Sequence, residues 1–515
     1  LSGSILGFSS NIIDSRVGLI LNSLESNLIN ANVSSIISSS GSSICISSFS
    51  SVIGGQNNIL SDGSQQSSII GGQNNTISGC SNYSSIIGGK FNNIYSDSCE
   101  SSIIGGNNNR NSSRYSSIIG GFCNNIQSYN SCENSFSILG GYCNQILYNS
   151  KTSTILGGKN NNILNSRYSI IGGGDGNSIS YYSVRSSIIG GDNNTLSCNS
   201  NQSSIIGGGF NTISGNSYFS SIIGGRDNTI SCYSRYSSII GGRINTLSCY
   251  SYFSSIIGGQ YNAISCNSNR SSIIGGKYNT LYCFSRYSSI IGGFQNVISG
   301  NTYYSSVIGG RENKLINSSQ QSLIFGGFEN RIYESSSRSS IIGGASSRIF
   351  SGSSYSSVIG GGSNNICLGT DFSSIIGGAF NEISCSSNRS SIIGGVDNIL
   401  SDNSNQSSII GGTCNQIFLD SNNSSVIGGC NNVLSGYSRY SSIIGGCSNT
   451  LYDCSNHSSI IGGCFNILYC NSNQSSIIGG YSNTLSCYSY QSSIIGGNNN
   501  QVTCSSYQSS IIGGN

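Results

Sequence analysis

The sequence predicts an all-β fold: a parallel β-solenoid of the β-helix or β-roll type, with one 17-residue coil per repeat and about 30 coils. The first observation behind this prediction is a glycine pair that occurs 28 times, from Gly54-Gly55 to Gly513-Gly514. Between Gly190 and Gly513 the spacing stays at 17 residues for 19 consecutive intervals. A fixed period of this length is typical of a solenoid, in which each unit buries its apolar face only against its neighbours.

The second observation is a composition that favours strands and tight turns over helices. The repeat is rich in glycine, asparagine and isoleucine, which are poor helix formers. The chain contains no proline, which would remove a hydrogen bond from a sheet. With residues 186–202 as the reference unit and Ser186 as position 1, strands are expected over 186–190 and 194–198, with bends at Gly190-Gly191 and around Ser200. Strands of successive coils would pair in parallel at about 4.8 Å.

The organisation along the chain follows the regularity of the repeat. Residues 1–50 are a degenerate version without the glycine pair, and we expect them to form atypical terminal coils or a cap. Residues 51–515 are expected to form the regular solenoid. Between Gly105 and Gly190 the spacing of the pairs drifts through 15, 20, 17, 15 and 18 residues. Such insertions and deletions belong at turns, so we expect an irregular zone over 105–190.

Asparagine occupies position 9 in 18 of the 19 units from Asn194 to Asn500, and Ser347 is the exception. Stacked coils turn this position into a ladder of like side chains. Asparagine tolerates left-handed turn geometry, and its amide can bond the amides above and below it. We therefore interpret the column as structural; the alternative is a row of ligand-binding amides. Its first members are Asn194, Asn211, Asn228, Asn245, Asn262 and Asn279.

Positions 3 and 4 form a pair of apolar residues. In the last 20 coils position 3 is isoleucine or valine, and position 4 is isoleucine except at Phe325. Because neighbouring side chains in a strand point to opposite faces, we expect position 4 to point inward, opposite position 11, and position 3 to point outward. An apolar stripe of this length indicates an interface, and the predicted lateral interface consists of Ile188, Ile205, Ile222, Ile239, Ile256 and Ile273. The alternative is a strand that bends between the two isoleucines and buries both.

Cysteines recur in columns instead of CxxC pairs, and the chain contains 21 of them. Stacked Cα atoms about 4.8 Å apart lie within disulfide range, so bridges between adjacent coils are one interpretation, which would imply an oxidising compartment. The other is that position 13 faces inward and its free cysteines act as small apolar residues. The candidates are Cys232, Cys249, Cys266, Cys283, Cys470, Cys487 and Cys504 at position 13, and Cys430, Cys447 and Cys464 at position 7.

Charge and candidate chemistry narrow the function classes. Only 8% of the residues are charged and the net charge is +3, which gives no electrostatic basis for binding nucleic acid or an acidic membrane. No run of 18 apolar residues could span a membrane as a helix. The single histidine, His457, is expected to be a turn residue, and a Ser-His-Asp triad could be assembled only through it. One histidine and the lack of clustered ligands argue against a zinc site. We expect no catalytic, cofactor-binding or metal site and no enzymatic activity.

The segment Ser186-Ser187-Ile188-Ile189-Gly190, repeated with asparagine and serine turns, resembles the head repeats of trimeric autotransporter adhesins. The resemblance extends over most of residues 51–515, and it implies a β-roll in which parallel chains pack side by side. The period is also similar to that of bacterial ice-nucleation repeats.

Two function hypotheses follow from these patterns. The first is a non-enzymatic structural fibre or rod protein at the surface of a cell, spore or virus particle. It would associate with itself laterally as a dimer or trimer, with end-to-end stacking as a further mode. One form of this hypothesis is that the fibre is adhesive. The second is a solenoid that presents a flat lattice of serine, asparagine and tyrosine to ice or glycan.

Overall fold

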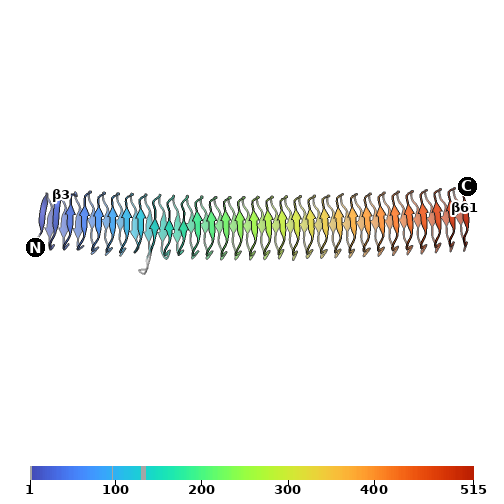
Figure 1. Ribbon diagram of the computed structural model, residues 1–515, viewed down its shortest axis with the longest axis horizontal. Helices are drawn as coiled ribbons and strands as arrows, with labels where there is room; N and C mark the ends of the chain where they lie inside the picture. Colours follow the sequence, from blue (N-terminus) through green and yellow to red (C-terminus); the bar gives the residue numbers. More distant parts are fainter. Residues whose placement is uncertain (1–2, 96, 129–134, 515) are drawn as a thin grey trace. The chain divides into compact units, whose positions relative to one another are not determined.

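The computed structural model describes residues 3–95, 97–128 and 135–514, and within these ranges the chain is all-β without a helix (Figure 1). Parallel strands are stacked in about 30 coils, which confirms the predicted β-solenoid. The chain divides into two units, Leu1–Gly258 and Gly259–Asn515, which are built from the same kind of coil.

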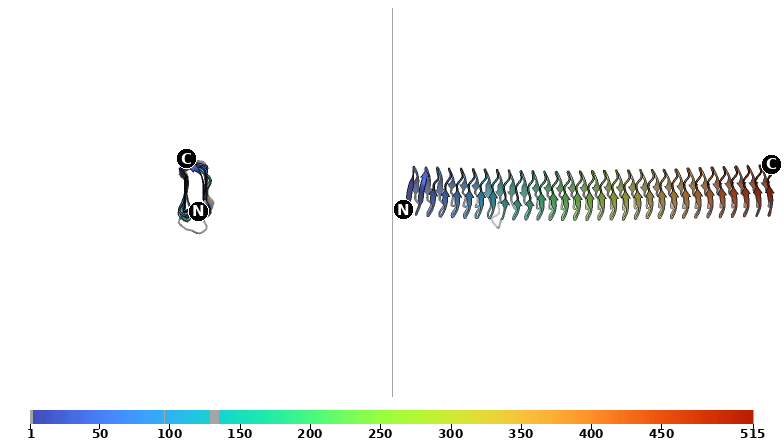
Figure 2. Two further views of the ribbon diagram at one scale, coloured as in Figure 1. Left: turned by 90° about the vertical axis from the view of Figure 1, so that its left-hand side faces the viewer. Right: turned by 45° about the horizontal axis from the view of Figure 1, so that its top comes forward.

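The coils of unit 1 carry two strands each. In the reference coil, β23 spans Ser187–Ile189 and β24 spans Thr195–Leu196. β23 pairs in parallel with β25 (Ser204–Ile206), and β24 pairs with β26 (Thr212–Ile213), so that each residue faces its equivalent 17 residues later. The odd-numbered strands build one sheet, called sheet A, and the even-numbered strands build sheet B. The two sheets form the long sides of a flattened coil (Figure 2).

The first coils of unit 1 adopt the same arrangement without the glycine pair. Their sheet A strands are β1 (Ser4–Phe8), β3 (Leu19–Leu24), β5 (Ser35–Ile37) and β7 (Ser51–Ile53), each paired in parallel with the next. The pairing of β1 with β3 contains a register shift, and all side chains of β1 are exposed. This irregularity is confined to the outermost strand pair of the described segment.

Unit 2 repeats the coil with little variation. Its sheet A strands run from β33 (Ser272–Ile274) to β61 (Ser510–Ile512) and comprise three residues each. Its sheet B strands run from β32 (Ala263–Ile264) to β60 (Gln501–Val502) and comprise two residues each. Between the ends of the unit, short strands suffice because each pairs with the equivalent strands of the coils above and below it, as β37 (Ser306–Ile308) does.

The core lies between the two sheets and consists of two facing columns. Side chains at position 3, such as Ile188, and at position 11, such as Leu196, are 0% exposed. The predicted orientation of the isoleucine pair is therefore wrong, because position 3 points inward and position 4 points outward. The alternative of burying both is wrong as well, since Ile189 is 53% exposed. All six residues of the predicted lateral interface belong to the core: Ile188, Ile205, Ile222, Ile239, Ile256 and Ile273.

The buried serine at position 1 explains this orientation. The backbone N–H of Ser203 donates to Oγ of Ser186 in the preceding coil at 3.4 Å, and Ser186 Oγ donates to the carbonyl of Ser200 at 3.1 Å. These bonds hold the position 1 side chain inside the corner of the coil. Since alternate residues of a strand share a face, Ile188 must point inward with Ser186. The phase of the strand is set by hydrogen bonding at its start.

The irregular zone keeps the stacking of the coils intact. The backbone N–H of Asn124 donates to Oδ1 of Asn109 over a separation of 15 residues, and Asn144 donates to Asn124 over 20. Asn161 and Asn177 continue the series over 17 and 16 residues, and all four distances are 3.0 Å. Differences in coil length are therefore absorbed away from this corner.

Gly172, in this zone, occupies a different position of the repeat from the one that the spacing of the glycine pairs suggested. Ile170 and Ile171 pair with Ser187 and Ile188, which puts Gly172 at position 4 instead of in the glycine pair. The pair is formed by Gly173 and Gly174, both with positive φ. The actual coil lengths here are thus 16 and 17 residues, where the glycine spacing gave 15 and 18.

Candidate functional surfaces

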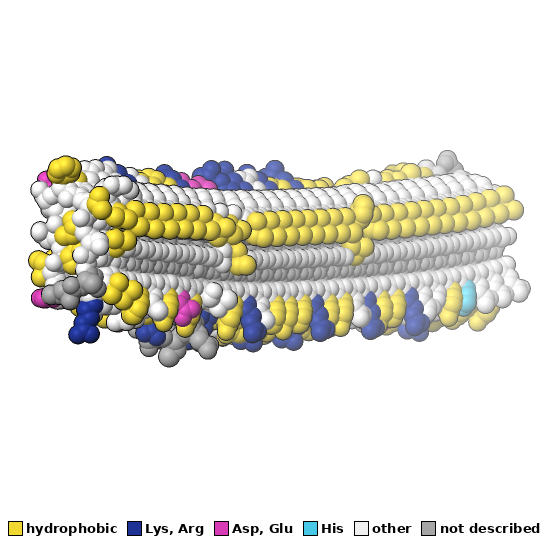
Figure 3. All heavy atoms as spheres, turned by 60° about the vertical axis from the view of Figure 1, so that its left-hand side comes forward, with side chains coloured by type: hydrophobic (Ala, Val, Ile, Leu, Met, Phe, Trp, Pro, Cys, Tyr) yellow, Lys and Arg dark blue, Asp and Glu magenta, His cyan; other side chains and the backbone are white. Residues whose placement is uncertain are grey.

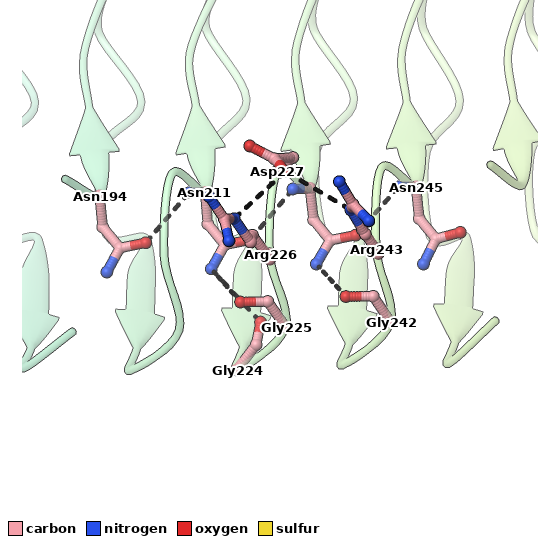
Figure 4. Close-up of polar contacts among 10 residues, drawn as sticks. Asn194, Asn211, Gly224, Gly225, Arg226, Asp227, Gly242, Arg243 and Asn245 are labelled. Atoms are coloured by element: carbon pink, nitrogen blue, oxygen red, sulfur yellow. Dashed lines mark hydrogen bonds and ion pairs between the residues drawn. The ribbon is translucent and has the colours of Figure 1, made fainter. Parts of the chain in front are cut away.

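The asparagines of position 9 form a buried ladder at one corner of the coil (Figure 4). The backbone N–H of Asn211 donates to Oδ1 of Asn194 at 3.0 Å, and Asn228 donates to Asn211 over the same distance. Nδ2 of Asn211 donates to the carbonyls of Gly224 and Gly225 in the next coil, at 3.3 and 3.2 Å. Each asparagine side chain thus bonds to backbone atoms of the next coil, and not to the neighbouring amides as we predicted.

Burial excludes this ladder as a ligand-binding row. The six asparagines identified from the sequence are 0% exposed: Asn194, Asn211, Asn228, Asn245, Asn262 and Asn279. Their amides have no access to solvent and are positioned to satisfy the backbone of the glycine turn. The alternative of a row of ligand-binding amides at position 9 is therefore wrong.

The two glycines beside the ladder differ in the reason why a larger residue would be unfavourable there. At Gly224, where φ is +64°, an added Cβ would meet nothing within 4 Å. At Gly225, where φ is +77°, an added Cβ would lie 2.4 Å from Asn228 Nδ2 and 2.5 Å from the Gly242 carbonyl oxygen. The first glycine serves the left-handed backbone alone, whereas the second also permits the close approach of successive coils.

Ser347 interrupts the asparagine ladder and allows a direct test of its energetics. Its Oγ still accepts a hydrogen bond from the Asn364 N–H at 3.3 Å, but a serine has no amide to donate to the next glycine turn. The substitution Ser347→Asn would restore donors to the carbonyls of Gly360 and Gly361. We expect it to stabilise these coils by about 0.5–1.5 kcal/mol, measured by hydrogen exchange of the neighbouring backbone amides.

The matched control for this substitution is the reverse change in the preceding coil. Asn330 donates to the carbonyls of Gly343 and Gly344 at 3.0 and 3.3 Å. Asn330→Ser should lower protection from exchange by a similar amount. An unchanged exchange rate in both variants would contradict the role assigned to the ladder.

The outer face of sheet A carries the most regular exposed surface. Side chains at position 4 form an apolar stripe on each unit (Figure 3). From Ile342 to Ile495, ten consecutive isoleucines are each 39–42% exposed. The half-buried serines of position 2 run parallel to this stripe. Phe325 is the aromatic member of the stripe in unit 2 and is 51% exposed.

The outer face of sheet B is far less uniform than that of sheet A. Its position 10 is occupied by residues as different as Thr195, Ala263, Lys314, Glu382 and Ile399. Both positions are at least partly open to solvent, so solvent exposure alone does not explain why position 4 is so restricted. The uniformity of position 4 therefore indicates a requirement specific to the outer face of sheet A.

The position 13 cysteines lie in a bend and not in the core. Cys232 and Cys266 are exposed, Cys249 and Cys283 are half-buried, and all four have φ of 52–53°. The interpretation of position 13 as an inward apolar position is therefore wrong, because the left-handed bend directs the side chain away from the core. All ten candidate cysteines are free thiols in the structure, so their bonding to one another stays a prediction.

Aromatic side chains at position 17 stack on one another along the solenoid. The rings of Phe219, Tyr236 and Phe253 follow each other with centroids 4.8 Å apart. His457 belongs to the same column of the repeat, and its ring stacks on Tyr440 with centroids 4.9 Å apart. It lies at a bend with φ of 57°, as expected for a turn residue.

One pair of like charges in neighbouring coils, Arg226 and Arg243, is compensated by a carboxylate. The backbones of Arg226 and Arg243 form a parallel β-bridge, so the two residues are direct neighbours along the stack. Oδ2 of Asp227 lies 3.6 Å from Nε of Arg226 and 3.9 Å from Nε of Arg243 (Figure 4). The carboxylate between the two guanidinium groups offsets the repulsion expected from like charges at strand spacing.

The remaining observations concern metal binding, membrane spans and similarity to known proteins. Among the described residues, histidine, cysteine and carboxylate side chains form no cluster that could hold a metal ion. The same residues include no helix of the length and apolar character needed to cross a membrane. No protein-family model matches the chain, and no curated protein sequence is significantly similar to it.

Proposed function

We propose that this chain is a non-enzymatic structural fibre protein of an extracellular or surface assembly on a cell, spore or virus particle. In this proposal it associates laterally with further copies of itself through the outer face of sheet A. The observation that carries the proposal is the stripe of position 4 isoleucines, which remain about 40% exposed in coil after coil. Long exposed apolar stripes on a folded protein mark interaction surfaces.

The shape of this face suits a second copy of the same chain. The isoleucine stripe runs beside the first glycine of each pair, and at Gly394 and Gly411 an added Cβ would meet nothing within 4 Å. The backbone next to the stripe is thus uncovered and can accept the isoleucines of a partner. A partner with the same coil spacing matches the stripe along its whole length, because both copies repeat at the distance between strands.

The energetics require many coils to act together. Burying the exposed part of one isoleucine contributes about 1 kcal/mol, since a full side chain contributes about 1.5–3 kcal/mol. Association also costs translational and rotational freedom and side-chain entropy. Several consecutive isoleucines must therefore be buried before a stable dimer or trimer forms. A repeated stripe provides this number without any unique high-affinity site.

The association can be tested by removing part of the stripe. We expect the fourfold variant Ile376→Thr, Ile393→Thr, Ile410→Thr and Ile427→Thr to weaken self-association at least tenfold, as measured by sedimentation velocity over a range of concentrations. Threonine keeps the β-branched shape that strands favour and removes apolar area.

The matched control carries threonine on the opposite outer face, at Ile399, Val433 and Ile467 of position 10. This control should associate like the wild type. If the wild type sediments as a monomer at all concentrations, or if both variants associate equally, the lateral interface is not on sheet A.

A second candidate function is the binding of ice or a glycan, and the regular repetition of exposed side chains on the outer face of sheet A favours it. The lattice on the outer face of sheet A differs from the predicted one, since it consists of serine at position 2 and isoleucine at position 4. Thermal-hysteresis and ice-shaping assays distinguish the two functions. Clear activity at micromolar protein, retained by the control and lost in the fourfold threonine variant, would replace the structural proposal.

A further inference from the structure

Three consecutive coils of unit 2 place a cysteine at position 7. The backbone of Cys430 forms a parallel β-bridge with that of Cys447, and Cys447 forms one with Cys464. The backbone N–H of each donates to a glycine carbonyl of the following coil at 3.0 Å, which holds the three residues in register. Neighbouring strands are about 4.8 Å apart, and disulfides join Cα atoms about 4.4–6.8 Å apart.

The side chains of this column start from adjacent backbone positions. The β-bridge between Cys430 and Cys447 places these two thiols at the same repeat position of neighbouring coils. Both residues, and Cys464 with them, are half-buried, so a small oxidant in solution can reach them. The same position holds Val396, Thr413 and Tyr481 in nearby coils, which shows that the fold does not require cysteine there.

We propose that the position 7 column is a disulfide site in which Cys447 bonds to either Cys430 or Cys464 and leaves the third thiol free. The central residue is shared because Cys430 and Cys464 are two strand spacings, or about 9.6 Å, apart. This separation exceeds the limit of about 7 Å beyond which two cysteines cannot bond without backbone movement. A column of three therefore yields one bond and one residual thiol.

The oxidation proceeds by thiol–disulfide exchange with a small disulfide such as glutathione disulfide. The thiolate of one cysteine attacks a glutathione sulfur, the sulfur–sulfur bond breaks, and one glutathione thiolate leaves. The thiolate of the adjacent cysteine then attacks the protein-bound sulfur and expels the second glutathione. Two protein thiols are oxidised to one disulfide, and glutathione disulfide is reduced to two glutathione thiols, which take up the two protons.

The reaction should accelerate with increasing pH because the thiolate is the attacking species. Partial burial raises the pKa of the Cys430 thiol above its ordinary value, and the neighbouring Cys447 thiol raises it further by a smaller amount. The fraction of thiolate at neutral pH is accordingly small. Raising the pH toward the pKa of this thiol increases that fraction.

Peptide mapping of the full-length protein treated with glutathione disulfide tests the proposal. Trypsin separates Cys430 from Cys447 by cleavage after Arg439, and an aspartate-specific protease separates Cys447 from Cys464 by cleavage before Asp453. Because the fragment that starts at Asp453 holds further cysteines, tandem mass spectrometry of the peptides that remain joined without reductant identifies the bonded residues. In the wild type we expect both the 430–447 and the 447–464 linkages, each in a fraction of the molecules.

Single serine variants decide between a shared central cysteine and unspecific oxidation. Cys430→Ser should give only the 447–464 linkage, and Cys464→Ser should give only the 430–447 linkage. Cys447→Ser should lose every linkage within the column, while native hydrogen-exchange protection shows that its coils remain folded. A 430–464 linkage in Cys447→Ser, or the absence of any linkage within the column of the oxidised wild type, would overturn the proposal.

Discussion

The substitution Gly225→Ala should unfold the coils around it, with a loss of at least about 4 kcal/mol in local stability. Its Cβ would lie 2.4 Å from Asn228 Nδ2 and 2.5 Å from the Gly242 carbonyl, and the carbonyl belongs to backbone that is fixed by the next coil. Relief would require the coils to move apart, which breaks the asparagine ladder at the same place. Hydrogen exchange of backbone amides in residues 203–254, together with limited proteolysis, measures the effect.

The neighbouring glycine provides the matched control. Gly224→Ala meets no atom within 4 Å, so only the left-handed backbone opposes it, at about 1–2 kcal/mol. Equal effects of the two substitutions would show that backbone conformation, and not the approach of successive coils, explains the glycine pair.

The second large effect is expected from truncating the core isoleucine of the same coil. Ile222 is 0% exposed and lies in the column that faces position 11, so Ile222→Ala should destabilise its surroundings by about 2–5 kcal/mol. Its neighbour Ile223 lies on the outer face of sheet A, and Ile223→Ala should cost no more than about 1 kcal/mol. Thermal unfolding and local hydrogen exchange compare the two variants.

The pair of alanine variants separates stability from association. Ile223→Ala should reduce the apolar area available to a partner while leaving the protection of its own coil close to that of the wild type. If Ile223→Ala were the more destabilising of the two in a monomeric sample, the assignment of position 3 to the core would be wrong.

The period of the repeat was sufficient to predict the fold, because the spacing of the glycine pairs alone implies one coil per unit. It was not sufficient to orient the isoleucines. Strand alternation permits either phase, and the phase depends on the hydrogen bonds of Ser186 Oγ with Ser200 and Ser203, which involve two neighbouring coils. A serine in the sequence does not reveal whether its hydroxyl faces solvent or the inside of a corner.

The bend around Ser200 was predicted, but the backbone conformation of this second corner was not. Cys198, Asn199 and Gln202 adopt positive φ of 54°, 59° and 53°, although only asparagine among these residue types favours that region. The stacking of identical coils imposes this conformation. Because this left-handed conformation was not predicted, the direction of the position 13 side chains could not be deduced. The asparagine column was recognisable from its repetition, but its bonds to the glycine turn needed coordinates.

The asparagine ladder has a consequence for how such a chain can change over generations. Asn109, Asn124 and Asn144 make the same 3.0 Å bond across intervals of 15 and 20 residues, so the junction between coils does not depend on the length of either coil. Any coil with asparagine at position 9 can follow any other such coil with the same donors and acceptors. Duplication or loss of a whole repeat in the gene would therefore yield a chain that still stacks, and the number of coils is open to selection independently of the fold.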